Sequence, residues 1–189
     1  MELFRSTGAY LEGHFLLTSG LHSGAYLQCA LVLQHPEAAA RLGAALASEL
    51  RRLAGQDIRI VASPALGGLI IGHEVARALG SRFLFTERDP ATKKMALRRG
   101  FAVTPGEKVV VVEDVITTGG STRDVIEVLR AAGADVLAAG SILDRSGGQS
   151  DVGVPRAALA TLNVATYEPA ACPLCKAGTP AVKPGSRPA

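Results

Sequence analysis

The strongest constraint on the fold is a run of four valines that ends in two acids, Val109–Val112 followed by Glu113 and Asp114. Consecutive β-branched residues without a polar interruption are typical of a strand buried on both faces, as in the middle of a parallel sheet. Neighbouring strand residues point to opposite faces, so the two acids should diverge at the carboxyl end of the strand, where open α/β sheets bind ligands. Acids at the end of a buried strand serve no packing purpose, which favours a functional role.

The residues after the acids form a pattern typical of a phosphate-binding loop. Thr117, Thr118 and Ser121 supply hydroxyl groups. Gly119 and Gly120 allow a tight turn that brings backbone N–H groups close to an anion. The apolar stripe that follows predicts a helix, whose positive N-terminal end would face a bound phosphate. Carboxylates accept hydrogen bonds from sugar hydroxyls, so acids and loop together predict a ligand that carries both a ribose and a phosphate.

Residues 109–122 resemble the phosphoribosyl pyrophosphate motif of type I phosphoribosyltransferases, whereas no GxxxxGK[ST] pattern points to a P-loop nucleotidase. The resemblance implies that the two acids hold the ribose hydroxyls, that Asp114 takes part in catalysis, and that the loop holds the 5′-phosphate. The implied contacts with phosphoribosyl pyrophosphate are Glu113, Asp114, Val115, Ile116, Thr117, Thr118, Gly119, Gly120 and Ser121. The alternative is an ordinary strand-turn-helix with solvated acids.

Two further segments resemble orotate phosphoribosyltransferases. Apolar residues alternate around a Ser-Gly turn within 15–27, which predicts a hairpin, although Thr18 stands where many members of that family have a pyrophosphate-binding lysine. Arg145 follows the apolar run 136–143 and could offer a bidentate fork to a carboxylate. The resemblance implies that Arg145 and Thr117 bind orotate. The alternative for Arg145 is an ion pair with Asp144 or Asp151.

A charged stretch, residues 86–99, has weak periodicity and a proline at position 90. A solvated surface loop is one reading, but beside an acid-phosphate motif the stretch predicts a basic lid over pyrophosphate. The resemblance implies that Arg88 contacts phosphoribosyl pyrophosphate and that Lys93 or Lys94 is catalytic, with the lid reaching the active site of a neighbouring subunit. A second strand-to-helix turn, residues 63–68, is a further candidate anion loop, and close helix packing explains its glycines equally well.

The cysteines and histidines predict no metal site. Cys172 and Cys175 form a single CxxC, and tetrahedral zinc needs four ligands, so a zinc site would require a second copy of the chain or distant ligands. Two reduced structural thiols in a turn are the favoured reading, and Cys29 is expected in the core. His14 and His22 have no partner at metal-binding spacing and are expected to be surface or hydrogen-bonding residues.

Composition limits the remaining possibilities. The chain has 189 residues and a net charge of +3, from 20 basic and 17 acidic residues, which is too small an excess to indicate nucleic-acid binding. No apolar run approaches membrane-spanning length and no signal-peptide pattern is present, so we expect a cytoplasmic protein. Regular elements are expected at residues 36–53, 58–62, 69–79, 83–85, 109–112, 125–132, 136–143 and 154–164.

Together these patterns predict an α/β fold with a central parallel sheet flanked by helices, as one domain with a core of about residues 35–149 and a small hood from about residues 1–34 and 150–189. The resemblance implies orotate phosphoribosyltransferase activity in pyrimidine (UMP) biosynthesis, with Mg²⁺, a homodimer, and orotate and phosphoribosyl pyrophosphate as substrates. The alternatives are a xanthine- or adenine-type phosphoribosyltransferase and a non-catalytic regulator that senses phosphoribosyl pyrophosphate.

Overall fold

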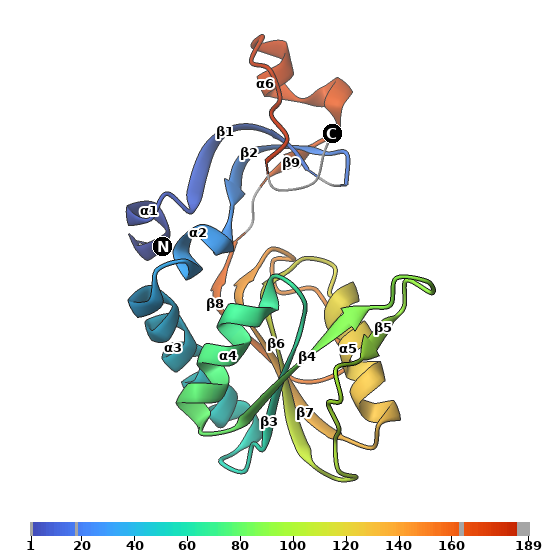
Figure 1. The fold of residues 1–189 in the computed structure, drawn as a ribbon. Coiled ribbons are helices and arrows are strands. Elements are labelled where there is room, and N and C mark those ends of the chain that lie inside the picture. Colours follow the sequence, from blue (N-terminus) through green and yellow to red (C-terminus); the bar gives the residue numbers. More distant parts are fainter. Residues whose placement is uncertain (1, 18, 163–164, 185–189) are drawn as a thin grey trace. The chain divides into compact units, whose positions relative to one another are not determined.

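The computed structural model describes residues 2–17, 19–162 and 165–184, so Thr18 lies outside the described residues. The chain divides into two compact units (Figure 1). The central unit is residues 35–162, and the terminal unit joins residues 1–34 to residues 163–189. Residues 156–161 pair with the central sheet and so belong to the central unit.

The central unit is built on a six-stranded sheet in the order β5-β4-β3-β6-β7-β8, in which only the edge strand β5 is antiparallel to its neighbour. The strands are β3 (Ile60–Pro64), β4 (Arg82–Arg88), β5 (Met95–Leu97), β6 (Lys108–Ile116), β7 (Asp135–Asp144) and β8 (Arg156–Thr161). The helices are α3 (Pro36–Ala54), α4 (Gly68–Leu79) and α5 (Gly120–Ala131). The predicted α/β class with a central parallel sheet is therefore confirmed.

Strand β6 is buried on both faces, as the valine run predicts. Val109–Val112 are fully buried, and Val109 and Val111 share one apolar cluster with Val125 and Leu129 of α5. Because side chains alternate along a strand, the other two valines face the opposite side, where α3 and α4 pack. Figure 1 shows α3 and α4 on one side of the sheet and α5 on the other. This double cover explains why β6 lacks the polar alternation of a half-exposed strand.

Residues 86–99 are more regular than the sequence indicates. The strand expected at residues 83–85 extends to Arg88, and β4 then pairs with β5 as an antiparallel hairpin. The turn between them is held by Asp89, whose carboxylate accepts hydrogen bonds from the backbone N–H groups of Ala91 (3.0 Å) and Thr92 (2.9 Å). A turn that is held by the hydrogen bonds of one side chain leaves no hydrophobic periodicity in the sequence, so periodicity alone did not reveal the hairpin.

The terminal unit contains a hairpin and short helices. Its elements are α1 (Glu2–Ser6), β1 (Tyr10–Leu16), β2 (His22–Leu27), α2 (Cys29–Leu33), β9 (Thr166–Tyr167), a 3₁₀ turn (Pro169–Ala171) and α6 (Pro173–Lys176). Strands β1 and β2 form the predicted antiparallel hairpin, and β9 pairs with β2. Among the described residues, none of the helices is both long enough and apolar enough to span a bilayer.

The two histidines of the terminal unit are more buried than expected. His14 and His22 are only 3% and 8% exposed, so a surface position is wrong for both, while their hydrogen bonding is confirmed. Cys172 is fully buried and Cys175 is exposed. Cys29 lies in the core as predicted. The two histidines lie next to Cys172 and Cys175 only in the folded terminal unit, because these residues are far apart in the sequence.

The carboxyl end of β7 is fixed by a buried ion pair in the central unit. The Asp144 carboxylate is 1% exposed and lies 2.6 Å from Nη1 of Arg156 on β8. It also accepts hydrogen bonds from the backbone N–H (2.7 Å) and the hydroxyl (2.6 Å) of Ser146. Burial alone would raise the pKa of Asp144, but the hydrogen bonds from Ser146 and Arg156 outweigh it, so the net pKa is lowered. The pair thereby fixes the start of the loop that carries Arg145.

Replacement of Arg156 by methionine should destabilise the protein strongly. The substitution leaves the buried Asp144 carboxylate without its cation, which typically costs about 3–5 kcal/mol. Urea unfolding at neutral pH measures the loss. The matched control is Arg52→Met, which breaks the solvent-exposed pair with Glu49 and should cost less than about 1 kcal/mol. Equal losses in the two variants would contradict a special role for the Asp144–Arg156 pair.

Candidate functional site

The two acids lie near the carboxyl end of β6, which runs to Ile116, and they differ in burial, but their side chains interact with each other instead of diverging as predicted. Glu113 is buried, with 7% of its surface exposed, whereas Asp114 is half-buried. Asp114 donates its backbone N–H to Glu113 Oε1 (3.3 Å), and Asp114 Oδ1 accepts the N–H of Val115 (2.8 Å). The strand end therefore presents one buried carboxyl group and one that reaches solvent.

Glu113 has the most strongly shifted pKa of the site. Burial raises the pKa of Glu113, and the negative charge of Asp114 raises it further, to about 9. Desolvation disfavours the charged form of an acid, and a neighbouring carboxylate of like charge acts in the same direction. Glu113 is therefore protonated at neutral pH in the ligand-free protein. Only one negative charge at the strand end then opposes an approaching phosphate.

The predicted phosphate loop lines a small pocket of about 80 Å³ at the N-terminus of α5. The wall consists of Glu113, Val115, Ile116, Thr117, Thr118, Gly119, Gly120, Ser121 and Thr122. The side chains of Thr117, Thr118 and Ser121 are exposed, so their hydroxyls are available to a ligand. The first backbone N–H groups of a helix lack partners within it and favour an anion. The pocket can thus hold a phosphate group.

Two contacts give this loop its shape. Gly119 has φ +76°, and a Cβ there would lie 2.5 Å from Ser150 Oγ and 2.8 Å from Val152 Cγ1, so only glycine suits the position. Nη1 of Arg123 donates to the carbonyls of Thr118 (2.9 Å) and Asp151 (2.5 Å). The loop is therefore held against residues 150–152. Sequence reasoning missed Arg123, although a basic residue one turn into the helix was a usable signal.

The second candidate anion loop lies beside Asp114. A Cβ at Gly67 would fall 2.8 Å from Asp114 Oδ1, and a Cβ at Gly68 would fall 2.8 Å from Cβ of Ser63. The Ala65 N–H donates to the carbonyl of Thr86 (2.9 Å). Gly68 thus serves helix packing, while Gly67 permits close approach of the turn to a site carboxylate. Close packing therefore explains both glycines, and anion binding by this turn stays a prediction.

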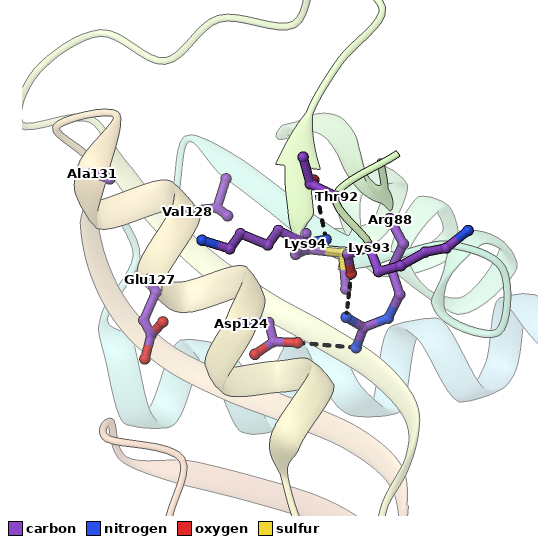
Figure 2. A pocket seen from close by; sticks show the side chains of 9 residues that line it. Arg88, Thr92, Lys93, Lys94, Asp124, Glu127, Val128 and Ala131 are labelled. Carbon is purple, nitrogen blue, oxygen red and sulfur yellow. Dashed lines mark hydrogen bonds and ion pairs between the residues drawn. The ribbon is translucent and has the colours of Figure 1, made fainter. Parts of the chain in front are cut away.

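The β4–β5 hairpin and α5 enclose a larger pocket of about 520 Å³ that brings Arg88, Lys93 and Lys94 together. Figure 2 shows the two lysines extending in opposite directions from the turn, and Arg88 directed at α5. Nη2 of Arg88 lies 3.0 Å from Asp124 Oδ2, and Nη1 donates to the Lys93 carbonyl (3.1 Å). Both partners of the ion pair are well exposed, so it contributes little stability and can open for a ligand.

These three basic residues do not line the small pocket of the phosphate loop. The fold brings Glu113 and the loop together, while the basic hairpin lies along α5 beside Asp124, Glu127 and Val128. Sequence reasoning did not single out Asp124 as a partner for Arg88. The two residues are 36 positions apart, and local spacing carries no signal for such a contact.

Arg145 directly follows β7, and its backbone is hydrogen-bonded to a residue in the wall of the loop pocket. Its N–H donates to the carbonyl of Ile116 (2.8 Å). The ion pair considered as an alternative is not formed, because Asp144 pairs with Arg156 and the Asp151 carboxylate accepts the N–H of Gly153 (2.8 Å). Within residues 2–17, 19–162 and 165–184, the Arg145 guanidinium has no acidic partner. It is available to an anionic ligand.

Comparison with known proteins gives a consistent picture. A family model described as "Phosphoribosyl transferase domain" matches residues 31–155. The orotate phosphoribosyltransferase of Pelotomaculum thermopropionicum is 56% identical over 187 residues, which cover 99% of this chain and 96% of the relative. That of Thermotoga maritima is 52% identical over 186 residues, which cover 98% of this chain and 97% of the relative.

Solved structures agree on the fold. The crystal structure of orotate phosphoribosyltransferase from Aeropyrum pernix superposes with a TM-score of 0.69 and 28% identity, covering 85% of this chain and 92% of the other. An adenine phosphoribosyltransferase structure gives a TM-score of 0.67 at 18% identity, covering 85% of this chain and all of the other. The second likeness supports the fold alone, since the two base specificities share it.

The raised pKa of Glu113 predicts a pH-dependent stability of the ligand-free protein. The unfolded chain ionises Glu113 near the ordinary value of 4.5, whereas the folded protein keeps the proton up to about pH 9. The folded state binds the extra proton in this window, so the contribution of Glu113 to stability is highest below pH 4.5 and falls as the pH rises. Between pH 5 and pH 8 the contribution of Glu113 should fall by roughly 2–4 kcal/mol.

Glu113→Gln should remove this slope, because glutamine stays neutral at every pH. Urea unfolding of both proteins at pH 5, 6, 7 and 8 checks the prediction, with the variant gaining relative stability at the higher pH values. Glu37→Gln, at an exposed glutamate of α3, is the matched control. If Glu113→Gln leaves the pH dependence of unfolding unchanged, Glu113 does not carry the raised pKa.

Proposed function

This chain belongs to the phosphoribosyltransferase family, and from that premise we propose that it transfers ribose 5-phosphate from phosphoribosyl pyrophosphate to orotate. The products are orotidine 5′-monophosphate and pyrophosphate, and the reaction belongs to pyrimidine (UMP) biosynthesis. One observation carries the proposal: a carboxyl group of the acid pair and the hydroxyl-rich loop line the same pocket at the N-terminus of α5. That arrangement suits a ligand with ribose hydroxyls next to a phosphate.

In this proposal each part of phosphoribosyl pyrophosphate has a partner in the central unit. Thr117–Ser121 hold the 5′-phosphate through backbone N–H groups and hydroxyls, with Val115 and Ile116 in the same wall. Glu113 and Asp114 bind the ribose hydroxyls. Because Glu113 is neutral in the ligand-free protein, it can donate as well as accept, and it adds no charge that would repel the polyanionic substrate.

Transfer breaks the bond between C1 of the ribose and the pyrophosphate oxygen, and the electron pair leaves with pyrophosphate. The ribosyl centre then has oxocarbenium character, which the Asp114 carboxylate stabilises electrostatically. Nitrogen N1 of orotate supplies the electron pair of the new bond and passes its proton to an oxygen of the departing pyrophosphate. Arg88 and either Lys93 or Lys94, carried by the β4–β5 hairpin, would stabilise the charge on the departing pyrophosphate when that hairpin closes.

Mg²⁺ is part of this proposal. It binds through one or two carboxylates together with substrate phosphates and keeps several waters, so it does not need an all-protein cage. The half-buried Asp114 fits that requirement, since its carboxylate lies at the strand end beside Gly67 of the second loop. When bound, Mg²⁺ neutralises charge on the pyrophosphate group. The chain's own contribution is to place one accessible carboxylate there.

The base site is assigned to Arg145 and Thr117. Arg145 has its backbone bonded to the residue before Thr117 and its guanidinium without an acidic partner among the described residues. A guanidinium forms bidentate hydrogen bonds with a planar carboxylate, and orotate carries one whereas adenine, hypoxanthine and xanthine do not. This difference favours orotate over the purine alternatives. A non-catalytic regulator gains no support from the site.

The deciding experiment follows the ultraviolet absorbance of orotate after the protein is mixed with phosphoribosyl pyrophosphate and Mg²⁺. Hypoxanthine, xanthine, adenine and uracil run in parallel. Turnover with orotate alone supports the proposal. Turnover with a purine instead would show that the base site is misassigned, and binding of phosphoribosyl pyrophosphate without turnover of any base would favour the regulator.

Arg145→Ala should raise the KM for orotate about 10–100-fold, because a charge-assisted bidentate contact is worth roughly 1.5–3 kcal/mol. The KM for phosphoribosyl pyrophosphate should change little. Steady-state kinetics with each substrate varied in turn make the comparison, and Arg59→Ala, at an exposed pair with Asp57, is the control. Equal increases in the two KM values would remove Arg145 from the base site.

We further propose that the protein works as a homodimer in the cytoplasm, with residues 1–189 acting as one phosphoribosyltransferase domain. The β4–β5 hairpin of one subunit would complete the active site of the other. Support comes from the absence of Arg88, Lys93 and Lys94 from the wall of the loop pocket in the single chain. The unbridged thiols Cys29, Cys172 and Cys175 accord with a reducing compartment.

Subunit mixing tests the shared hairpin. A double variant, Lys93→Ala with Lys94→Ala, and the variant Asp114→Asn should each be nearly inactive. In a mixed dimer one active site receives an intact hairpin and an intact Asp114, so a re-equilibrated equal mixture should recover about a quarter of wild-type activity. A mixture as inactive as its two components would show that each hairpin serves its own subunit.

A further inference from the structure

Two histidines and two cysteines of the terminal unit converge on one point. His14 lies on β1, His22 on β2, Cys172 at the N-cap of α6 and Cys175 within α6. One ligand-capable atom from each lies within 4.8 Å of the others. His14, His22 and Cys172 are buried. These four residues, the His₂Cys₂ cluster, are separate from every residue assigned to the proposed transferase site.

The distances within the cluster approach those of a tetrahedral zinc site. Typical Zn–N and Zn–S bonds place sulfur and nitrogen ligands about 3.5 Å apart. Here the distance from His14 Nε2 is 3.4 Å to Cys172 Sγ and 3.8 Å to Cys175 Sγ, and Cys175 Sγ lies 3.3 Å from His22 Nδ1. The two imidazole nitrogens, His14 Nε2 and His22 Nδ1, are 2.7 Å apart, so a cation would separate them slightly.

Hydrogen bonding alone does not satisfy this arrangement. The Thr179 carbonyl lies 2.6 Å from His14 Nδ1 and can only accept, so Nδ1 carries the proton. In the neutral ring, Nε2 then has a single lone pair, yet His22 Nδ1, Cys172 Sγ and Cys175 Sγ all approach it. A lone pair accepts one good hydrogen bond. A cation bound by all four atoms resolves the competition.

The surroundings of His14 match those of a metal ligand. A metal-bound histidine usually donates its other ring N–H to a carbonyl or carboxylate, which fixes the tautomer and the ring orientation, and Thr179 does this for His14. The register of β1 against β2 shifts between Glu12 and Phe15, and such bulges re-aim side chains. The irregularity falls at His14 and directs it towards His22.

The terminal unit also has a physical need for such a link. It joins two short stretches from opposite ends of the chain, and small units seldom bury enough apolar surface to be stable without a disulfide or a metal. The backbone of Val182 already pairs with β1, through its N–H to the His14 carbonyl (2.8 Å) and its carbonyl to the Leu16 N–H (2.9 Å). A cation would join α6 to the same hairpin.

We propose that His14 Nε2, His22 Nδ1, Cys172 Sγ and Cys175 Sγ bind a structural Zn²⁺ ion. An S₂N₂ donor set with a CxxC pair favours zinc, and four protein ligands leave no open position for catalysis. From the sequence, the CxxC was interpreted as two structural thiols because only the residues near it in the chain could be considered. The distant ligands that zinc requires come from β1 and β2, more than 150 residues away.

Metal analysis of the full-length protein, purified without chelators and under reducing conditions, is the first test. Wild-type protein should contain about one zinc ion per chain. Cys175→Ser and His14→Asn should each lose most of it, and Cys29→Ala and His35→Asn should keep it. Cys29 and His35 lie outside the cluster and match the two residue types. Wild-type zinc content no higher than that of the cluster variants would overturn the proposal.

Cobalt substitution keeps the proposal testable if a cluster variant fails to fold. Wild-type protein stripped of metal and titrated with Co²⁺ should develop the d–d bands of a tetrahedral ion and a thiolate-to-cobalt charge-transfer band, saturating at one equivalent. Metal removal should also lower the midpoint of thermal unfolding, and added Zn²⁺ should restore it. A reduced protein that takes up no Co²⁺, or one isolated metal-free with a Cys172–Cys175 disulfide, would refute the zinc site.

Discussion

The burial of β6 on both faces is the constraint on which the central unit depends. Val109–Val112 are covered by α5 on one side and by α4 on the other, so the strand has one place and one register in the sheet. The position of the valines therefore fixes the position of the residues that follow them in the chain. Glu113 and Asp114 lie near the carboxyl end of the strand, which runs to Ile116, and the loop to α5 begins directly after it. The four buried valines thus position a polar site although none of them is polar.

The same burial sets the electrostatics of the site. Glu113 is buried, which raises its pKa, while Asp114 is half-buried beside Gly67 and reaches solvent. One residue of spacing therefore divides two chemically similar acids into a neutral and an accessible one. A substrate with several phosphate charges meets less repulsion as a result. Beside them, Asp144 and Arg156 neutralise each other internally, which leaves the Arg145 guanidinium for a ligand.

The terminal unit depends on a different principle. It has few buried large side chains, and its order comes from backbone pairing between the two chain ends and from the His₂Cys₂ cluster. Residues that are separated by most of the sequence supply the contacts. A bound zinc ion would make the folding of this unit depend on both ends of the chain at once, independently of the chemistry proposed for the central unit.

The sequence by itself determined the α/β class, the positions of most central strands and helices, and the acid-loop motif, because these follow from local periodicity and from glycine and hydroxyl spacing. It also indicated the family. Only the tertiary structure decided that Arg156, not Arg145, pairs with Asp144, that Arg88 meets Asp124, and that His14 and His22 meet the CxxC. Such contacts join residues on different elements, and their partners are selected by strand order and helix packing, which no local pattern encodes.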